Sequence, residues 1–224
     1  MADQVDARAL SVAVLGGTGD QGQGLAYRLG VAGVHVIIGS RDPQRAQACA
    51  AAIDGRVTGV VEGAANDAAS AQADVVIVAV PWAAHESTLR DLTEQLADKI
   101  VVDCVNPLGF DSHGPYRLDV AAGSAAEQAA GLLPRSRVVA AFHNVSASML
   151  MDASVDDLDQ DVLVLGDDRP ATDVVRALAD LMPGVRGVFG GRLRNAGQVE
   201  ALTANLIAIN RRYKARSGIR ITGL

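Results

Sequence analysis

The chain has 224 residues, of which 49% are hydrophobic and 3% aromatic, and its formal net charge is −6. This length suits one α/β domain, alone or with a small appendage, and a core of alanine and branched aliphatic residues. The negative charge argues against nucleic acid as a partner, and the apolar runs are too short to span a membrane. Met1–Ala9 lacks the pattern of a secretory leader, and Cys49 and Cys104 lack the spacing of a metal site. We therefore expect a cytoplasmic protein with two reduced thiols.

The first predicted strand, Val12–Leu15, leads into a glycine-rich turn of the form G-x-G-x-x-G. This turn consists of Gly17, Thr18, Gly19, Asp20, Gln21 and Gly22. The first glycine permits a sharp bend, the second lets backbone approach a pyrophosphate, and the third allows the following helix, predicted over Gly24–Leu29, to pack closely. A strand before the turn and a helix after it predict a dinucleotide site.

The second predicted strand, Val34–Ile38, identifies the dinucleotide, because it ends in Gly39-Ser40-Arg41 without an acidic residue. A carboxylate at this place would bind the ribose 2′-hydroxyl of NAD and repel a 2′-phosphate. A hydroxyl and a guanidinium favour that phosphate, and Arg45 lies one helical turn beyond Arg41. The sequence therefore predicts NADP(H) as the cofactor.

Strands and helices alternate along the remainder of the first part of the chain. The predicted elements are a helix over Pro43–Ile53, a weak strand over Arg56–Val61, a helix over Asn66–Gln72, a strand over Val75–Val80, a helix over Ala84–Ala97, a strand over Ile100–Val105, a helix that begins at the capping box Ser124–Glu127, and a strand over Val138–Phe142. This alternation predicts an α/β fold with a doubly wound parallel sheet, the NADP-binding Rossmann fold.

The pattern loosens after Val145, which suggests a small C-terminal α/β extension. It contains a strand over Asp161–Leu165, a helix over Pro170–Leu181, a strand over Val185–Phe189 and a helix over Ala196–Tyr213 with one apolar face. We therefore divide the chain into residues 10–145, the NADP-binding domain, and residues 146–224, the extension. Seven basic residues follow Gly190 and only Glu200 opposes them, which fits a second anion site, a subunit contact or a solvated helix face.

Ligands of open parallel sheets lie at the carboxyl ends of the strands, where this chain places three polar or aromatic groups. These are Pro81-Trp82, Asn106-Pro107 and His143-Asn144-Val145. Trp82 could form the wall of a ring site or pack under a loop, and His143 could contact a ligand or have a structural role. There is no Ser/His/Asp set, metal cluster or Tyr-x-x-x-Lys pair, so no residue is assigned as a catalytic acid or base.

Several short motifs together resemble the NADPH-dependent coenzyme F420 reductases. They are Leu15–Gly19, Gly22–Ala26, Gly39–Arg41, Val80–Trp82, the Ser-Ala-Ala-Glu at 124–127, Gly166–Asp168 and the closing Gly218–Leu224. The resemblance covers Val12 to Leu224. It implies an enzyme that transfers a hydride reversibly between NADP(H) and the deazaflavin coenzyme F420, with the nicotinamide C4 stacked against the deazaflavin C5, and it implies a homodimer.

The resemblance also implies roles for individual residues. The pyrophosphate would lie against Thr18, Gly19, Asp20 and Gln21, and the 2′-phosphate against Ser40, Arg41 and Arg45. The nicotinamide and the deazaflavin would be bordered by Val80, Trp82, His143, Val145, Ala147 and Ile219. The chain departs from the family at Arg45, where the family has lysine, and at Asn144 and Ser146, where an archaeal type has threonine and proline.

Two other functions fit the same dinucleotide site. One is an NADPH-dependent reductase of a flavin, a ferric chelate or an imine. The other is a non-catalytic module that senses NADP(H) and signals through a partner.

Overall fold

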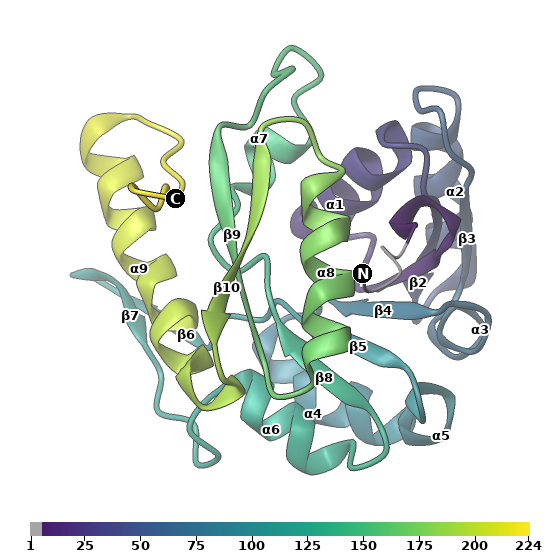
Figure 1. Cartoon of the computed structure of the whole chain (residues 1–224), viewed down its shortest axis with the longest axis horizontal. Helices are drawn as coiled ribbons and strands as arrows, with labels where there is room; N and C mark the ends of the chain where they lie inside the picture. The colour runs from purple at the N-terminus through teal and green to yellow at the C-terminus, as the bar shows by residue number, and fades with distance from the viewer. Residues whose placement is uncertain (1–5) are drawn as a thin grey trace.

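The computed structural model describes residues 6–224 of the chain. Its centre is an eight-stranded sheet with the strand order β10-β9-β8-β5-β4-β1-β2-β3 (Figure 1). The strands are β1 (Ser11–Leu15), β2 (His35–Ser40), β3 (Val61–Ala65), β4 (Val75–Val78), β5 (Ile100–Asp103), β8 (Arg137–Ala140), β9 (Gln160–Gly166) and β10 (Val185–Gly191). The predicted α/β fold with a doubly wound sheet is confirmed.

The chain reverses its direction of winding between β1 and β4. Strand β1 pairs in parallel with β2 on one side and with β4 on the other, so that Val14 lies beside both Ile38 and Ile77. A crevice opens at this switch point, outside the carboxyl ends of the two central strands. The order of the six parallel strands is the one that binds dinucleotides in doubly wound folds.

The last two strands differ from a fully parallel sheet. Strand β9 pairs with β8 in the antiparallel direction, whereas β10 pairs with β9 in parallel. Together with α8 (Arg169–Asp180) they form a βαβ unit that runs opposite to the rest of the sheet. Both strands belong to the main sheet, and the predicted division at residues 145 and 146 stays a prediction.

Alternate residues of the strands face two helical layers. Val12, Val14 and Ile77 pack against the layer formed by α1 (Asp20–Val31), α2 (Pro43–Asp54), α7 (Ala147–Leu150) and α8. Ala13 and Val76 pack against the other layer. That layer is formed by α3 (Asn66–Gln72), α4 (Trp82–Asp91), α5 (Thr93–Leu96), α6 (Ala125–Leu132), the 3₁₀ helix η2 (Leu193–Asn195) and the start of α9 (Ala196–Tyr213). Another 3₁₀ helix, η1 (Ala7–Ala9), precedes β1.

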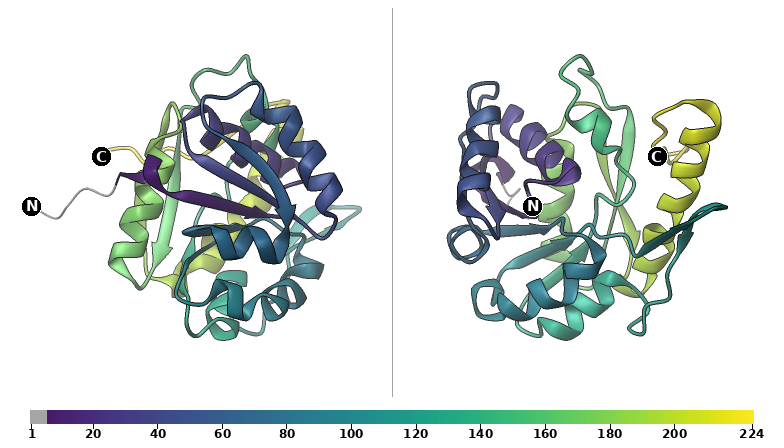
Figure 2. Two further views of the ribbon diagram at one scale, coloured as in Figure 1. Left: turned by 90° about the vertical axis from the view of Figure 1, so that its right-hand side faces the viewer. Right: turned by 180° about the vertical axis from the view of Figure 1, so that it is seen from behind.

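Helix α9 lies at one end of the molecule, far from α2 and β3 at the other (Figure 2). A hairpin of β6 (Leu108–Asp111) and β7 (Gly114–Arg117) extends beside it. Within the described residues, no helix is both long and apolar enough to cross a membrane. The predicted absence of a leader concerns Met1–Ala9, whose first five residues lie outside the described part.

Several predicted boundaries are wrong. The third strand is Val61–Ala65, not Arg56–Val61. Strand β4 ends at Val78. Strand β8 ends at Ala140, two residues before Phe142, whose φ of +63° lies outside the extended region of a strand. The long helix predicted over Ala84–Ala97 is divided at Leu92 into α4 and α5.

Candidate functional site

A cavity of about 780 Å³ lies at the switch point of the sheet. Its lining combines the glycine turn after β1, the end of β2, the start of α2 and the segment after β4. The lining residues are Gly16, Thr18, Gly19, Asp20, Gln21, Ser40, Arg41, Asp42, Arg45, Asn66, Ala79, Val80, Pro81, Ala84 and Thr88. Eight residues that the sequence predicts to bind a cofactor thus face one cavity: Thr18, Gly19, Asp20, Gln21, Ser40, Arg41, Arg45 and Val80.

The glycines shape the turn in different ways. Gly16 has a φ of +73°, and a Cβ there would lie 2.7 Å from the carbonyl oxygen of Ala79. A Cβ on Gly22 would lie 2.6 Å from the carbonyl oxygen of Gly16, so this glycine lets α1 begin directly behind the turn. Gly19 is exposed, and its nearest neighbour is 3.4 Å from such a Cβ. The turn therefore forms a cradle of bare backbone at the N-terminus of α1, which suits a pyrophosphate.

Ser40, Arg41 and Arg45 lie together at the end of β2 and the start of α2. Arg41 and Arg45 are exposed, and within residues 6–224 neither forms an ion pair. The Ser40 hydroxyl accepts a hydrogen bond from the Asp42 backbone N–H at 3.1 Å. Two free guanidinium groups beside a hydroxyl form a site of the right chemistry for a phosphate.

Sequence reasoning missed one carboxylate in this cavity. Asp42 lines it, but its Oδ1 accepts hydrogen bonds from the backbone N–H groups of Gln44 and Arg45 at 3.0 and 3.2 Å. This carboxylate caps α2 and does not take the place of the NAD-type acid at the end of β2. The pair Asp42-Pro43 is a helix-start signal, and could have indicated this role from the sequence.

Asn66 and Thr88 are further lining residues that the sequence analysis did not identify. Asn66 is the first residue of α3, and its buried Oδ1 has no hydrogen-bond partner. It lies over Gly39, where a Cβ would approach this oxygen to 2.9 Å. Only the fold brings these residues to the glycine turn, so no local signal in the sequence marks them.

Trp82 is the first residue of α4 and is half-buried beside the cavity, not among its lining residues. Its ring packs against that of His85, with 5.4 Å between the centroids. His85 is fully buried and contacts the Asp103 carboxylate at 2.6 Å through Nε2 and the Gln128 amide oxygen at 2.8 Å through Nδ1. Burial alone would lower the pKa of His85, but the two hydrogen bonds and the nearby carboxylates outweigh it and raise the pKa. A buried, hydrogen-bonded pair therefore supports the helix that carries Trp82.

Glu200 of α9 is buried near this pair. Its two oxygens accept hydrogen bonds from the backbone N–H groups of Ala125 and Ala126 at the start of α6. Burial raises the pKa of Glu200 to about 7, although these two bonds oppose the shift. Asp103, at the end of β5, is the acid inside an apolar strand that could have indicated such a buried network from the sequence.

His143 lies in the segment after β8 and is 3% exposed. Both of its ring nitrogens are buried without a hydrogen-bond partner, and burial lowers its pKa to about 4. The ring is therefore neutral at pH 7, with free donor and acceptor capacity. Its carbonyl oxygen is fixed by Asn106 Nδ2 at 3.1 Å and Thr203 Oγ1 at 3.0 Å. Val145 is also buried and Ala147 half-buried, and none of the three lines the cavity.

Ile219 lies in the C-terminal segment, away from the glycine turn. Its carbonyl oxygen accepts a hydrogen bond from the Asp161 backbone N–H at 2.6 Å, which holds the segment beside the start of β9. Because β9 runs antiparallel to β8, its start lies at the same edge of the sheet as the carboxyl end of β8. Three of the seven basic residues of this region form ion pairs with acids of the chain, at Arg192–Asp167, Arg216–Asp152 and Arg220–Asp159.

No group of three histidine, cysteine, aspartate or glutamate residues in the described structure is arranged to hold a metal ion. The site instead combines an open phosphate cradle with a buried, apolar region beside it. The fold and this cleft define a dinucleotide-binding protein of the doubly wound class.

Comparisons with known proteins identify the family. The sequence profile described as NADP oxidoreductase, coenzyme F420-dependent, matches residues 11–107. The F420-dependent NADP reductase of Methanothermobacter thermautotrophicus is 45% identical over 96% of this chain and 96% of its own length. That of Methanocaldococcus jannaschii is 39% identical over 96% of this chain and 99% of its own. The chain therefore belongs to the F420-dependent NADP reductase family.

A solved structure agrees with this assignment. The crystal structure of a candidate F420-dependent NADP reductase from an Arthrobacter species is similar with a TM-score of 0.79 and 29% identity. The similarity covers 96% of this chain and 100% of that one.

Proposed function

We propose that this protein catalyses reversible hydride transfer between NADP(H) and coenzyme F420. The observation that carries the proposal is the cavity of about 780 Å³, in which the glycine turn and the Ser40, Arg41 and Arg45 cluster face the same space. Membership in a family whose relatives act as F420-dependent NADP reductases supports the choice of acceptor. NADPH, when bound, supplies the hydride that the deazaflavin accepts.

The residues of the cavity divide the task of holding the dinucleotide. Thr18, Gly19 and the N-terminus of α1 would hold the pyrophosphate through backbone N–H groups and the helix dipole. Ser40, Arg41 and Arg45 would hold the 2′-phosphate, far from the reacting ring. At Gly16 and Gly22 neighbouring backbone atoms lie so close that a Cβ would collide with them, so this shape of the cradle requires glycine at both positions.

The region beside Val80 and Trp82 would border the nicotinamide. The neutral ring of His143, with Val145 and Ala147, would form the wall on the acceptor side, and Ile219 would approach from the C-terminal segment. Because both reactants carry the reactive groups, the protein contributes orientation and the exclusion of water. We assign no residue as a general acid or base.

The function is tested by following the visible absorbance of oxidised F420 after NADPH or NADH is added. We expect rapid bleaching with NADPH and little with NADH. Tight NADPH binding without bleaching would contradict the proposal. Turnover of a flavin, ferric chelate or imine would then indicate another reductase, and no turnover of any acceptor would indicate a sensing module.

We also propose that the protein is a cytoplasmic homodimer. Leu202, Ile209 and Tyr213 of α9 remain exposed on one side of the helix, and Phe110 and Tyr116 of the neighbouring hairpin are exposed as well. Exposed apolar surface of this kind is typical of an interface. Sedimentation of the wild type and of Ile209→Glu tests the dimer, and fractionation of cells tests the location. A monomeric wild type would contradict the proposed dimer.

A further inference from the structure

One face of α1 contacts the segment of residues 142–155 along most of its length. Gln21, Gly24 and Arg28 are spaced by three and four residues, so they lie on the same side of the helix. The segment contains His143, Val145 and Ala147, which we place on the acceptor side of the site. Helix α1 therefore joins this segment to the glycine turn, from which the helix begins.

Arg28 holds the end of the segment. Its guanidinium is buried, with the residue 3% exposed, and donates four hydrogen bonds to backbone carbonyl oxygens. Nε donates to Leu150 at 2.8 Å, Nη1 to Val155 at 2.8 Å, and Nη2 to Met149 and Asp152 at 2.8 and 2.9 Å. No carboxylate of residues 6–224 forms an ion pair with it. A buried charge whose four hydrogen bonds all go to carbonyl oxygens fixes the path of the backbone, since each bond has a defined direction.

Gly24 and Gln21 contact the middle and the beginning of the segment of residues 142–155. A Cβ on Gly24 would lie 2.5 Å from the Leu150 Cβ, so α7 rests directly on the backbone of α1. Gln21 Nε2 donates to the carbonyl oxygen of Phe142 at 3.2 Å. Gln21 also lines the dinucleotide cavity. The same side chain thus faces the cleft and contacts the start of the segment.

We propose that the face formed by Gln21, Gly24 and Arg28 is a positioning element that fixes segment 142–155, and with it the acceptor side of the site, relative to the bound dinucleotide. The inference rests on the proposed function, because the acceptor side is assigned there. None of the three residues needs to touch the acceptor. They act through the backbone of the segment.

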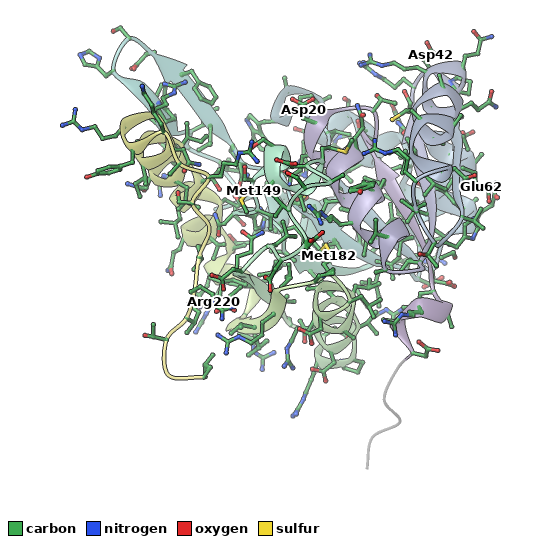
Figure 3. All side chains as sticks on the ribbon, turned by 90° about the horizontal axis from the view of Figure 1, so that it is seen from above. Asp20, Asp42, Glu62, Met149, Met182 and Arg220 are labelled. Carbon is green, nitrogen blue, oxygen red and sulfur yellow. The ribbon has the colours of Figure 1, made fainter. Side chains whose placement is uncertain are left out.

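The C-terminal segment is attached to the same element. The Asp152 side chain accepts a hydrogen bond from Arg216 Nη1 at 2.7 Å, while its carbonyl oxygen is bound by Arg28. Seen from above, Met149 lies between Asp20 at the start of α1 and Arg220 of the C-terminal segment (Figure 3). The element therefore extends from the phosphate cradle through α7 to the segment that carries Ile219.

Gly24→Ala is the direct test. The new Cβ requires the Leu150 Cβ to move by about 1 Å to reach an ordinary carbon–carbon separation. A misplacement of about 1 Å can reduce turnover by about a hundredfold. We expect this loss in kcat with F420, while the Kd of NADPH, measured by its fluorescence, changes by less than about twofold. Gly131→Ala is the matched control, because Gly131 lies in α6 and a Cβ there meets nothing within 4 Å.

Arg28→Lys is a second, independent variant. Lysine keeps the charge but lacks the planar fork that reaches four carbonyl oxygens, so the KM for F420 should rise and the Kd of NADPH should not. Arg135→Lys, at an exposed ion pair, is its control. Hydrogen exchange provides a readout without F420: amides of residues 142–155 should exchange faster in both variants than in the wild type. Turnover of F420 by the wild type is measured in parallel, and it reports separately on the proposed function.

The outcomes separate the alternatives. Selective loss on the acceptor side with faster exchange in 142–155 supports the proposal. Unchanged kinetics in both variants, or a rise in the Kd of NADPH in proportion to the loss of turnover, would overturn it. If neither variant folds, the wild type decides: bound NADPH should slow exchange in 142–155 through Gln21, and no change there would also overturn the proposal.

Discussion

Arg41 provides the sharpest test of the dinucleotide assignment. Its side chain is exposed in the cavity and forms no ion pair within the described residues, so its removal leaves no buried partner unsatisfied. A hydrogen bond to a charged group contributes about 1.5–3 kcal/mol, and solvent exposure favours the lower end of this range. A loss of about 1.4 kcal/mol corresponds to about a tenfold weaker interaction. We therefore expect Arg41→Ala to raise the KM for NADPH by about tenfold.

The same substitution should leave two other quantities unchanged. The kcat with NADPH should stay within about twofold, because the 2′-phosphate is remote from the hydride and its binding is uniform along the reaction. The KM for NADH should not change, because NADH lacks this phosphate. Steady-state kinetics with both nucleotides and with Arg135→Ala as control measure these effects. An equal loss in kcat, or an equal effect on NADH, would refute the assignment of Arg41.

Two further substitutions test the cradle and the buried network. Gly16→Ala forces a φ of +73° on alanine and a 2.7 Å contact with the carbonyl oxygen of Ala79, so we expect lower thermal stability and weaker NADPH binding; a thermal melt and an NADPH titration that match the wild type would contradict this. Glu200 has a folded-state pKa of about 7, against an ordinary value of 4.5. As the pH rises from 4.5 through about 7, the unfolded state therefore releases this proton before the folded state does, and the free energy of unfolding falls. Over that range the wild type should lose on the order of 3 kcal/mol of unfolding free energy relative to Glu200→Gln, measured by urea denaturation. A pH-independent difference between the two proteins would show that Glu200 is ionised in the fold.

The parts of the fold that could be predicted carry local signals. The glycine turn, the two strands beside it and the capping box at Ser124 were identified because hydrophobic pattern and turn chemistry agree there. The direction of β9 and β10 could not be predicted, because a short apolar run in the sequence does not indicate which way its strand will run in the sheet. Only tertiary packing selects that direction. The hairpin of β6 and β7 was overlooked although Gly114, with a φ of +118°, occupies its turn.

In the candidate site, too, features with a local sequence signal could be predicted and features that depend on tertiary contacts could not. Ser40 and Arg41 are neighbours in the chain, so one motif was enough to predict that they face the same site. His85 and Asp103 come from different elements, and Arg28 meets carbonyl oxygens more than a hundred residues away. Contacts of this kind depend on the tertiary fold. For the basic C-terminal region the sequence leaves a second anion site, a subunit contact and a solvated helix face open, and the structure adds that Arg216 and Arg220 pair with acids of the same chain.

The most direct test of the central claim is to follow the hydrogen atom itself. Oxidised F420 is mixed with NADPH that carries deuterium at C4 in one of the two configurations, in ordinary water, and the reduced coenzyme is analysed by mass spectrometry. Direct transfer between two rings held face to face predicts one deuterium at C5 from one epimer and none from the other. Reduced coenzyme without deuterium from either epimer would contradict the account, since the hydrogen would then come from solvent or a protein group.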